Sequence, residues 1–138
     1  MNWKLEVVMV PVSDVERAKT FYASAAGFTV DHDVTPTDDV RVVQLTPRGS
    51  GCSIVIGSGL GGMEPGSLQG LQLTVSDIDV ARAHLAEHGI DVSDVRHKGP
   101  PDQNGTKFVF FSDPDGNGWA VQELRGAEDP AHVSASTT

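Results

Sequence analysis

The segment VPVSDVERAKTFYASAAGFTV, residues 10–30, recurs in altered form as LTVSDIDVARAHLAEHGIDV, residues 73–92. Both copies contain Val-Ser-Asp near the start and a glycine near the end. The segments that follow also match, because PRGSGCSIVI at residues 47–56 corresponds to PDGNGWAVQE at residues 114–123. A repeat of this length indicates that the chain contains two copies of one structural unit.

Each copy predicts one strand, one helix and three more strands. Apolar residues alternate before each Val-Ser-Asp, which indicates a strand. Ser13 or Asp14 can then cap a helix that ends at Gly27, and Asp77 and Gly89 take these places in the second copy. The further strands are expected at residues 28–34, 41–46 and 52–56, and again at residues 90–95, 107–112 and 119–124.

The glycine-rich segment between the copies, GSGLGGMEPGSLQG, has no apolar periodicity and indicates a linker. The end of the chain is small and polar, which is typical of a flexible tail. We therefore expect a single domain over residues 1–124. Its parts are a module at 5–56, a linker at 57–69 and a module at 70–124, and a tail follows at 125–138.

Composition excludes several functional classes. Hydrophobic residues make up 38% of the 138 residues and charged residues 21%, as in globular proteins. No apolar run approaches the ~20 residues of a membrane span. A net charge of -9 opposes binding to nucleic acid. The single cysteine, Cys52, excludes an intrachain disulfide and favours the reducing cytoplasm, so we expect a cytoplasmic protein with no membrane partner.

The tandem βαβββ pattern resembles the vicinal oxygen chelate superfamily, and so do the segments VSD…A…FY and SDPDGNGW. That group includes glyoxalase I, extradiol dioxygenases, fosfomycin-resistance proteins and bleomycin-binding proteins. The resemblance covers residues 5–124. It implies an α+β fold in which two tandem βαβββ modules form a concave, partly closed cleft of mixed sheet, with the helices outside. It also implies a homodimer, because modules of this fold pair within or between chains.

Metal-dependent members of this superfamily bind a divalent metal with His and Glu from the first and last strand of each module. The resemblance places those positions at Val7, Ser53, Gly70 and Ala120. Together they offer one hydroxyl, with no imidazole and no carboxylate. A shift of one residue would turn each side chain to the other face of the sheet. We therefore expect no metal and no cofactor.

The segment Asp113-Pro114-Asp115-Gly116 predicts a tight turn before the last strand. Both aspartates are expected to bond turn backbone, Pro114 fixes φ, and Gly116 is expected at positive φ. The turn is therefore interpreted as a structural corner, and the strand that follows it still lines the cleft.

Strand alternation predicts which residues face the cleft. They form a mostly apolar surface with a few neutral hydrogen-bonding groups, which is typical of a small-molecule pocket. Close packing of the two modules is the alternative explanation for the small residues among them. The predicted ligand-binding residues are Val7, Met9, Ser53, Val55, Gly70, Gln72, Thr74, Ala120 and Gln122.

Candidate catalytic groups are His32, His97 and Gln122. Both histidines are expected at the ends of corresponding strands near the cleft mouth, where imidazoles can exchange protons near neutral pH. A surface role is the alternative for each. Arg41 and Lys107 open corresponding strands and are candidates to meet an anionic ligand.

Three functions follow. The first is a sequestering protein that binds a small aromatic or polycyclic molecule without a metal, like the bleomycin-binding branch, and the missing ligands favour it. The second is a metal-independent isomerase, lyase or cyclase that uses the same cleft. The third is a metal-dependent glyoxalase or dioxygenase with unusual ligands. The residues leave open which molecule binds and whether any reaction follows.

Overall fold

The computed structural model of this protein describes residues 1–58, 62–98 and 106–124. The tail predicted at 125–138 lies outside the described residues. The chain folds into two units: unit 1 contains Met1–Gln69 and Ser112–Gly118, and unit 2 contains Gly70–Phe111 and Trp119–Thr138. Among the helices of the described residues, none is long and apolar enough to span a membrane.

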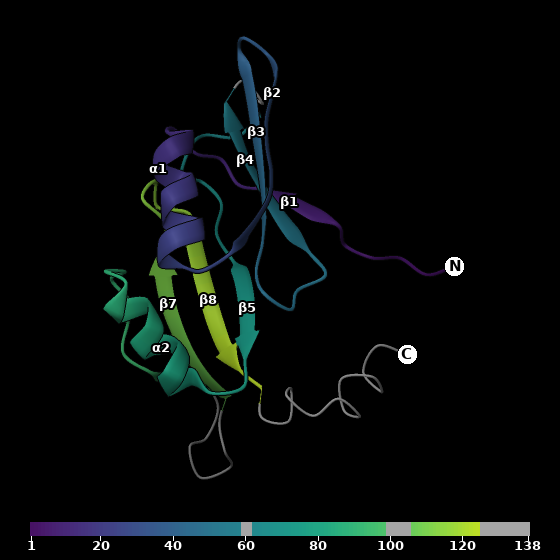
Figure 1. Cartoon of the computed structure of the whole chain (residues 1–138). Coiled ribbons are helices and arrows are strands. Elements are labelled where there is room, and N and C mark those ends of the chain that lie inside the picture. The colour runs from purple at the N-terminus through teal and green to yellow at the C-terminus, as the bar shows by residue number, and fades with distance from the viewer. Residues whose placement is uncertain (59–61, 99–105, 125–138) are drawn as a thin grey trace. The chain divides into compact units, whose positions relative to one another are not determined.

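Unit 1 contains one four-stranded sheet in the order β1-β4-β3-β2 (Figure 1). Strand β1 runs parallel to β4, and the other neighbouring pairs are antiparallel. The elements are β1 (Val7–Met9), α1 (Val15–Thr20), the π-helical turn η1 (Phe21–Ala25), β2 (Thr29–Thr37), β3 (Val40–Thr46) and β4 (Ser53–Ser58).

The sheet of unit 2 repeats this order as β5-β8-β7-β6. Its elements are β5 (Leu71–Val75), α2 (Ile78–Glu87), β6 (Arg96–Lys98), β7 (Thr106–Ser112) and β8 (Gly118–Glu123). Strand β5 is parallel to β8, as β1 is to β4. The predicted fold class is confirmed: the chain is α+β, built from two tandem βαβββ modules with mixed four-stranded sheets.

The predicted helix caps are present in both modules. Asp14, rather than Ser13, caps α1 by accepting the backbone N–H of Arg17 at 3.1 Å. Asp77 caps α2 and accepts two backbone N–H groups of its first turn, at 3.0 and 3.1 Å. Gly27 and Gly89 follow the two helical segments with φ of 86° and 81°, a conformation that favours glycine.

The prediction of a strand at residues 90–95 is wrong. The structure instead has the short strand β6, which starts at Arg96. The reason lies at Ser93, whose hydroxyl accepts the N–H of Phe110 at 2.9 Å and whose carbonyl accepts Nε of Arg82 at 2.9 Å. A side chain therefore takes the place that a backbone carbonyl would hold in a regular ladder.

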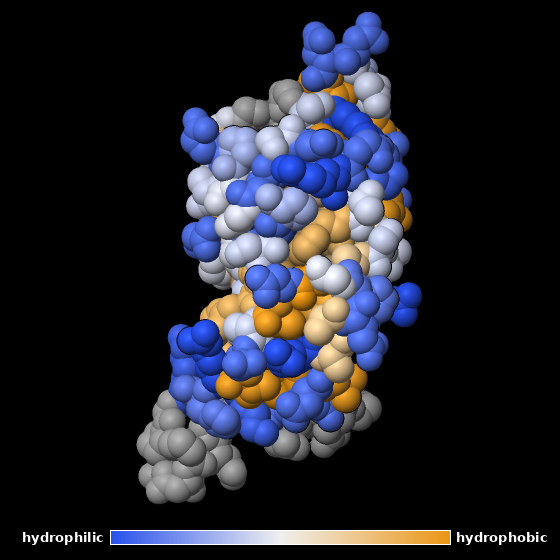
Figure 2. Space-filling view, turned by 90° about the vertical axis from the view of Figure 1, so that its left-hand side faces the viewer, coloured by the Kyte–Doolittle hydropathy of each residue, from blue (hydrophilic) through white to orange (hydrophobic). Residues whose placement is uncertain are grey.

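The core of unit 1 lies between its sheet and α1. Strands β3 and β4 alternate, so that every second side chain points toward the helix. The buried side chains on the sheet are Val43, Leu45, Ile54 and Ile56, and those on the helical segment are Val15, Ala18 and Tyr22. On the surface that Figure 2 shows, hydrophilic residues surround smaller groups of hydrophobic ones.

Candidate functional site

The sheet of unit 1 has a second face, which we call the open face because it points away from the core residues. One row of paired residues crosses all four strands there. Met9 on β1 pairs with Val55 on β4, Val55 pairs with Gln44 on β3, and Gln44 pairs with His32 on β2. This row runs from two apolar side chains at one edge to two polar side chains at the other.

Four of the residues predicted to bind ligand lie together on this open face. Val7 is paired with Ser53, just as Met9 is paired with Val55. Val7 and Met9 are 38% and 41% exposed, whereas Ser53 is only 8% exposed. The alternation used for the prediction therefore holds on β1 and β4.

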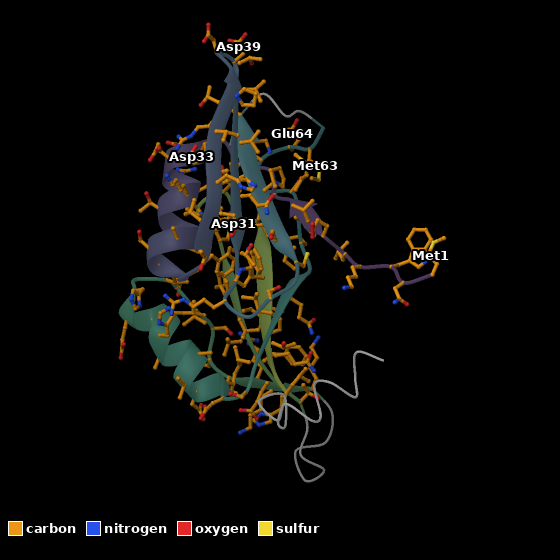
Figure 3. The ribbon with its side chains drawn as sticks, turned by 45° about the vertical axis from the view of Figure 1, so that its right-hand side comes forward. Met1, Asp31, Asp33, Asp39, Met63 and Glu64 are labelled. Carbon is orange, nitrogen blue, oxygen red and sulfur yellow. The ribbon has the colours of Figure 1, made fainter. Side chains whose placement is uncertain are left out.

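A β-bulge adds a residue to the polar edge of the open face. The pairing of β2 with β3 shifts between Val30 and His32, which leaves Asp31 as the extra residue. A bulge can turn two consecutive side chains to one side of a sheet. Asp31 and His32 both bond to Gln44, so both lie on the open face, while Asp33 bonds to Lys19 of α1 (Figure 3).

The polar side chains of the open face form one hydrogen-bond network. Nε2 of Gln44 lies 3.4 Å from Oδ2 of Asp31 and 3.4 Å from the Ser53 hydroxyl. The Thr46 hydroxyl donates to the same Oδ2 and lies 2.6 Å from the Ser53 hydroxyl. Nε2 of His32 lies 3.3 Å from Oε1 of Gln44. The network thus joins three strands around one carboxylate.

Sequence reasoning missed three members of this network, namely Asp31, Gln44 and Thr46. The available signal is the run Asp-His-Asp at residues 31–33, because three consecutive polar residues do not fit a strand with one core face. His32 was expected at a strand end, and that expectation is wrong. Strand β2 continues past the bulge to Thr37, which leaves His32 inside the strand.

Unit 2 also has an open face, formed on β5 and β8 by Gln72, Thr74, Ala120 and Gln122. Gln72 pairs with Ala120 and Thr74 with Gln122, and the amide of Gln72 donates to that of Gln122. Gly70 lies before β5 with φ of 90°, so Gln72 rather than Gly70 is opposite Ala120. The two-residue difference keeps the same face, because side chains alternate with a period of two.

Two phenylalanines on β7 extend this open face, and sequence reasoning missed them. Phe108 and Phe110 alternate with the buried Val109 and Phe111. Their ring centroids are 6.1 Å apart and the ring planes differ by 9°. Nζ of Lys98 lies 5.2 Å from the centroid of Phe108. The alternation within residues 107–112 contained this signal, since it places Phe108 and Phe110 on one side and Val109 and Phe111 on the other.

The remaining charged candidates take other places. His97 is the middle residue of β6, is exposed and pairs with Lys107 on β7. Arg41, a candidate to meet an anionic ligand, has a guanidinium that pairs with Asp33 at 2.6 Å and with Glu16 at 2.6 Å. Hydrogen bonds to these carboxylates raise the pKa of Arg41 above its usual range.

The predicted turn is present, and Asp113 organises it. Its Oδ1 accepts the backbone N–H groups of Asp115 and Asn117 at 3.0 and 2.9 Å. Its Oδ2 accepts the Tyr22 hydroxyl at 2.7 Å and the amide of Asn117 at 2.8 Å. Gly116 has φ of 101°, as expected. The turn is therefore bonded to η1 as well as to itself.

Asp115 has a different role from the one expected. It does not bond turn backbone but accepts the N–H and hydroxyl of Ser13 at 3.1 and 2.5 Å, together with the guanidinium of Arg17 at 3.2 Å. Its side chain is thus committed to the start of α1. The turn also holds the end of the linker, because Asn117 accepts the N–H of Leu68 at 3.0 Å.

A separate pocket of about 330 Å³ lies in unit 1 where β1 leads into α1. Of the residues that line it, Met9 alone belongs to the row described above. Met63 also lines it and is labelled in Figure 3. Its lining is Met9, Val10, Pro11, Val12, Ser13, Val15, Gly57, Ser58, Met63 and Pro65.

The model of the Glyoxalase/Bleomycin resistance protein/Dioxygenase superfamily matches residues 4–121, so this chain belongs to that superfamily and the resemblance is confirmed. The structure is similar to that of TnmS3, an antibiotic-binding protein from Streptomyces sp. CB03234. The two are 36% identical, over 88% of this chain and 96% of that chain, with a TM-score of 0.75.

Two further structures are similar to this one. A glyoxalase/bleomycin resistance protein from Streptomyces sp. CB03234 is 37% identical, over 87% of this chain and 100% of that chain, with a TM-score of 0.72. A member of the same superfamily from Sphaerobacter thermophilus DSM 20745 is 28% identical, over 89% of this chain and 98% of that chain, with a TM-score of 0.76. No curated protein matches this chain.

The divalent metal implied by the superfamily does not fit the residues at its expected positions. Val7, Gly70 and Ala120 offer no side-chain donor, and the Ser53 hydroxyl already bonds to Thr46. Within residues 1–58, 62–98 and 106–124, no three His, Cys, Asp or Glu side chains are grouped so as to hold a metal ion. We therefore assign no step to a metal.

Proposed function

We propose that this protein sequesters a small organic molecule, of the antibiotic type, with the residues of its open faces and without a divalent metal. The observation that carries the proposal is the chemistry of those faces, where Val7, Ser53 and Ala120 stand in place of metal ligands. A mostly apolar surface with a few polar groups is the usual composition of a small-molecule site. The likeness to the antibiotic-binding protein TnmS3 supports the same function.

The proposed ligand contains a flat aromatic system. Parallel rings of Phe108 and Phe110 on the open face of unit 2 support this, because aromatic groups stack well on such rings. Gln72, Thr74 and Gln122 can bond polar groups at the edge of the ligand. The proposed binding residues are Val7, Met9, Ser53, Val55, Gly70, Gln72, Thr74, Ala120 and Gln122, with Phe108 and Phe110 added.

The proposal is tested with a panel of antibiotics that contain fused aromatic rings. A ligand at about one hundred times its Kd should stabilise the protein by about 2.7 kcal/mol, which raises Tm by several degrees. Mass spectrometry should recover the ligand unchanged after hours with the protein. Steady conversion of the ligand would contradict sequestration, and the absence of any shift across the panel would contradict binding.

A matched pair of variants tests the open face of unit 2. Ala120→Trp should fill the space beside Gln72 and abolish the Tm shift, because the new indole occupies the place of the ligand. Ala83→Trp on the exposed surface of α2 adds the same side chain elsewhere and should leave the shift unchanged. If the site is closed, the larger side chain of Ala120→Trp would overpack it and lower the free energy of unfolding by ~1–3 kcal/mol. The unfolding of this variant is therefore measured alongside its binding. An unchanged shift in folded Ala120→Trp would place the ligand elsewhere.

Treatment with a chelator tests the absence of a metal. Protein purified without a tag should contain well under one equivalent of transition metal, because a single hydroxyl binds such ions weakly. EDTA should therefore leave both the Tm and the ligand-induced shift unchanged. A stoichiometric metal whose removal lowers the Tm would overturn this part of the proposal.

A further inference from the structure

We propose that Asp31 forms a recognition site for a positively charged group of the ligand, such as a protonated amine. This inference rests on the proposed function, because it assigns a chemical class to the molecule bound at the open face of unit 1. Asp31 reaches that face through the β-bulge in β2 and lies in the hydrogen-bond network with His32, Gln44, Thr46 and Ser53.

The direction of the hydrogen bonds in this network supports the proposal. The Thr46 hydroxyl gives its hydrogen to Oδ2 of Asp31, so its oxygen accepts from Ser53. The Gln44 amide also donates to Oδ2, and its carbonyl oxygen lies within reach of Nε2 of His32. Two donors of the network, the Thr46 hydroxyl and the Gln44 amide, therefore point toward the same carboxylate oxygen. These bonds fix the orientation of the carboxylate and use only one of its two oxygens.

The second oxygen, Oδ1, is available for a ligand. In the part of the chain that the structure describes, neither a hydrogen bond to Oδ1 nor an ion pair of Asp31 is found. Asp33, two residues along the same strand, is paired with both Arg41 and Lys19. Strand β2 therefore carries one carboxylate whose charge is compensated and one whose charge is not.

The surroundings of Asp31 favour a cation over an anion. The other open-face residues near it are neutral amides, hydroxyls and aliphatic groups, with His32 as the one ionisable neighbour in the network. The formal net charge of -9 adds a field that attracts cations. A carboxylate also forms stronger hydrogen bonds with a charged donor than with a neutral one. A ligand that covers Asp31 would remove water from it and strengthen this preference.

Two probes with one ring system test the proposal. Both 2-naphthylmethylamine and 2-naphthalenemethanol carry naphthalene, but only the amine is charged at neutral pH. Each is titrated into the ¹⁵N-labelled full chain, and the shifts of backbone amides give the affinity and the site. We expect the amine to bind roughly five- to tenfold more tightly than the alcohol, with the largest shifts around Asp31.

Asp31→Asn should remove this preference, because it weakens the binding of the charged amine far more than that of the neutral alcohol. Asp39→Asn, in the turn between β2 and β3, removes the same charge away from the open face and should retain the preference. A salt series on the parent protein gives an independent measure. From about 20 mM to about 500 mM NaCl, the Debye length shrinks from roughly 20 Å to roughly 4 Å, so the preference should decrease.

The outcomes separate this inference from the proposed function. Equal affinity of the two probes for the parent protein, or a preference that survives in Asp31→Asn, would overturn the cation site and leave aromatic binding intact. Failure of both naphthalene probes to bind anywhere on the open faces would overturn the proposed function as well.

Discussion

The two faces of the unit 1 sheet are made by the same strands. They differ in how far their side chains are buried and paired with other groups of the unit. On β3, Val43 and Leu45 point toward α1 and are fully buried, while Gln44 and Thr46 point to the open face. The core face is thus covered by α1 of the same unit. The open face has an apolar edge at β1 and a polar network at β2, and most of its residues remain partly exposed.

The aspartates of β2 show the same difference in charge. Asp33 faces α1, where Arg41 and Lys19 neutralise it. Asp31 faces the other way and meets only hydroxyl and amide groups. One carboxylate therefore stabilises the fold, and the other is left for recognition. Both aspartates are exposed, but only Asp33 has its charge compensated by basic side chains. Exposure alone therefore does not distinguish a carboxylate that can bind a ligand from one that is already paired.

Neighbouring residues on β3 give the largest expected contrast in stability. Leu45→Ala should lower the free energy of unfolding by about 2–5 kcal/mol, because it opens a cavity in the core. Gln44→Ala on the open face should cost less than about 1 kcal/mol, because it removes only long hydrogen bonds. Urea unfolding of both variants measures the difference, and similar losses would refute the assignment of the two faces.

The turn after β7 contains a second contrast, between two aspartates two residues apart. Asp113 is 5% exposed and accepts four hydrogen bonds. Asp113→Ala should therefore cost roughly 2–4 kcal/mol, since it leaves the buried Tyr22 hydroxyl and Asn117 amide without this acceptor. Asp115→Ala should cost about 1 kcal/mol, because Ser13 can turn to water. If Asp115→Ala proved the more damaging in thermal unfolding, the turn would be anchored through α1 instead.

Most of the fold could be predicted because its signals are local and occur twice. Val-Ser-Asp and the glycine after each helix locate the caps, and apolar alternation locates the strands. The error at residues 90–95 arose because the Ser93 hydroxyl, rather than a backbone carbonyl, accepts the N–H of Phe110, which no pattern of hydropathy reveals. The superfamily could be recognised from the same repeat and from the residues of the turn before the last strand.

The candidate site could be predicted only in part. Alternation assigned Val7, Met9 and Ser53 to one face, because β1 and β4 are regular there. It could not assign Asp31, because a bulge interrupts the period of two on which such an assignment depends. It also could not show that Asp115 bonds to Ser13, since contacts between residues far apart in the chain follow from the fold.

The smallest expected effect concerns the compensated aspartate, Asp33, and its dependence on pH. Hydrogen bonds from Arg41 and Lys19 lower the pKa of Asp33 below its usual range. The folded chain therefore keeps this carboxylate ionised at a pH where the unfolded chain protonates it. Its contribution to stability is complete above the ordinary aspartate pKa of about 4 and is lost as the pH falls through the lowered value.

Asp33→Asn should reduce the free energy of unfolding by about 0.5–1 kcal/mol at about pH 7, a small effect because water screens these partly exposed ion pairs. The gap between parent and variant should narrow below about pH 4, because the unfolded parent then binds a proton at Asp33 that the folded parent does not. It should also narrow in about 1 M NaCl, where the Debye length is only about 3 Å. Urea unfolding across this pH range measures the gap. A gap that stays constant from neutral to acid pH would mean that Asp33 acts through packing, and the two aspartates of β2 would then not differ in charge compensation.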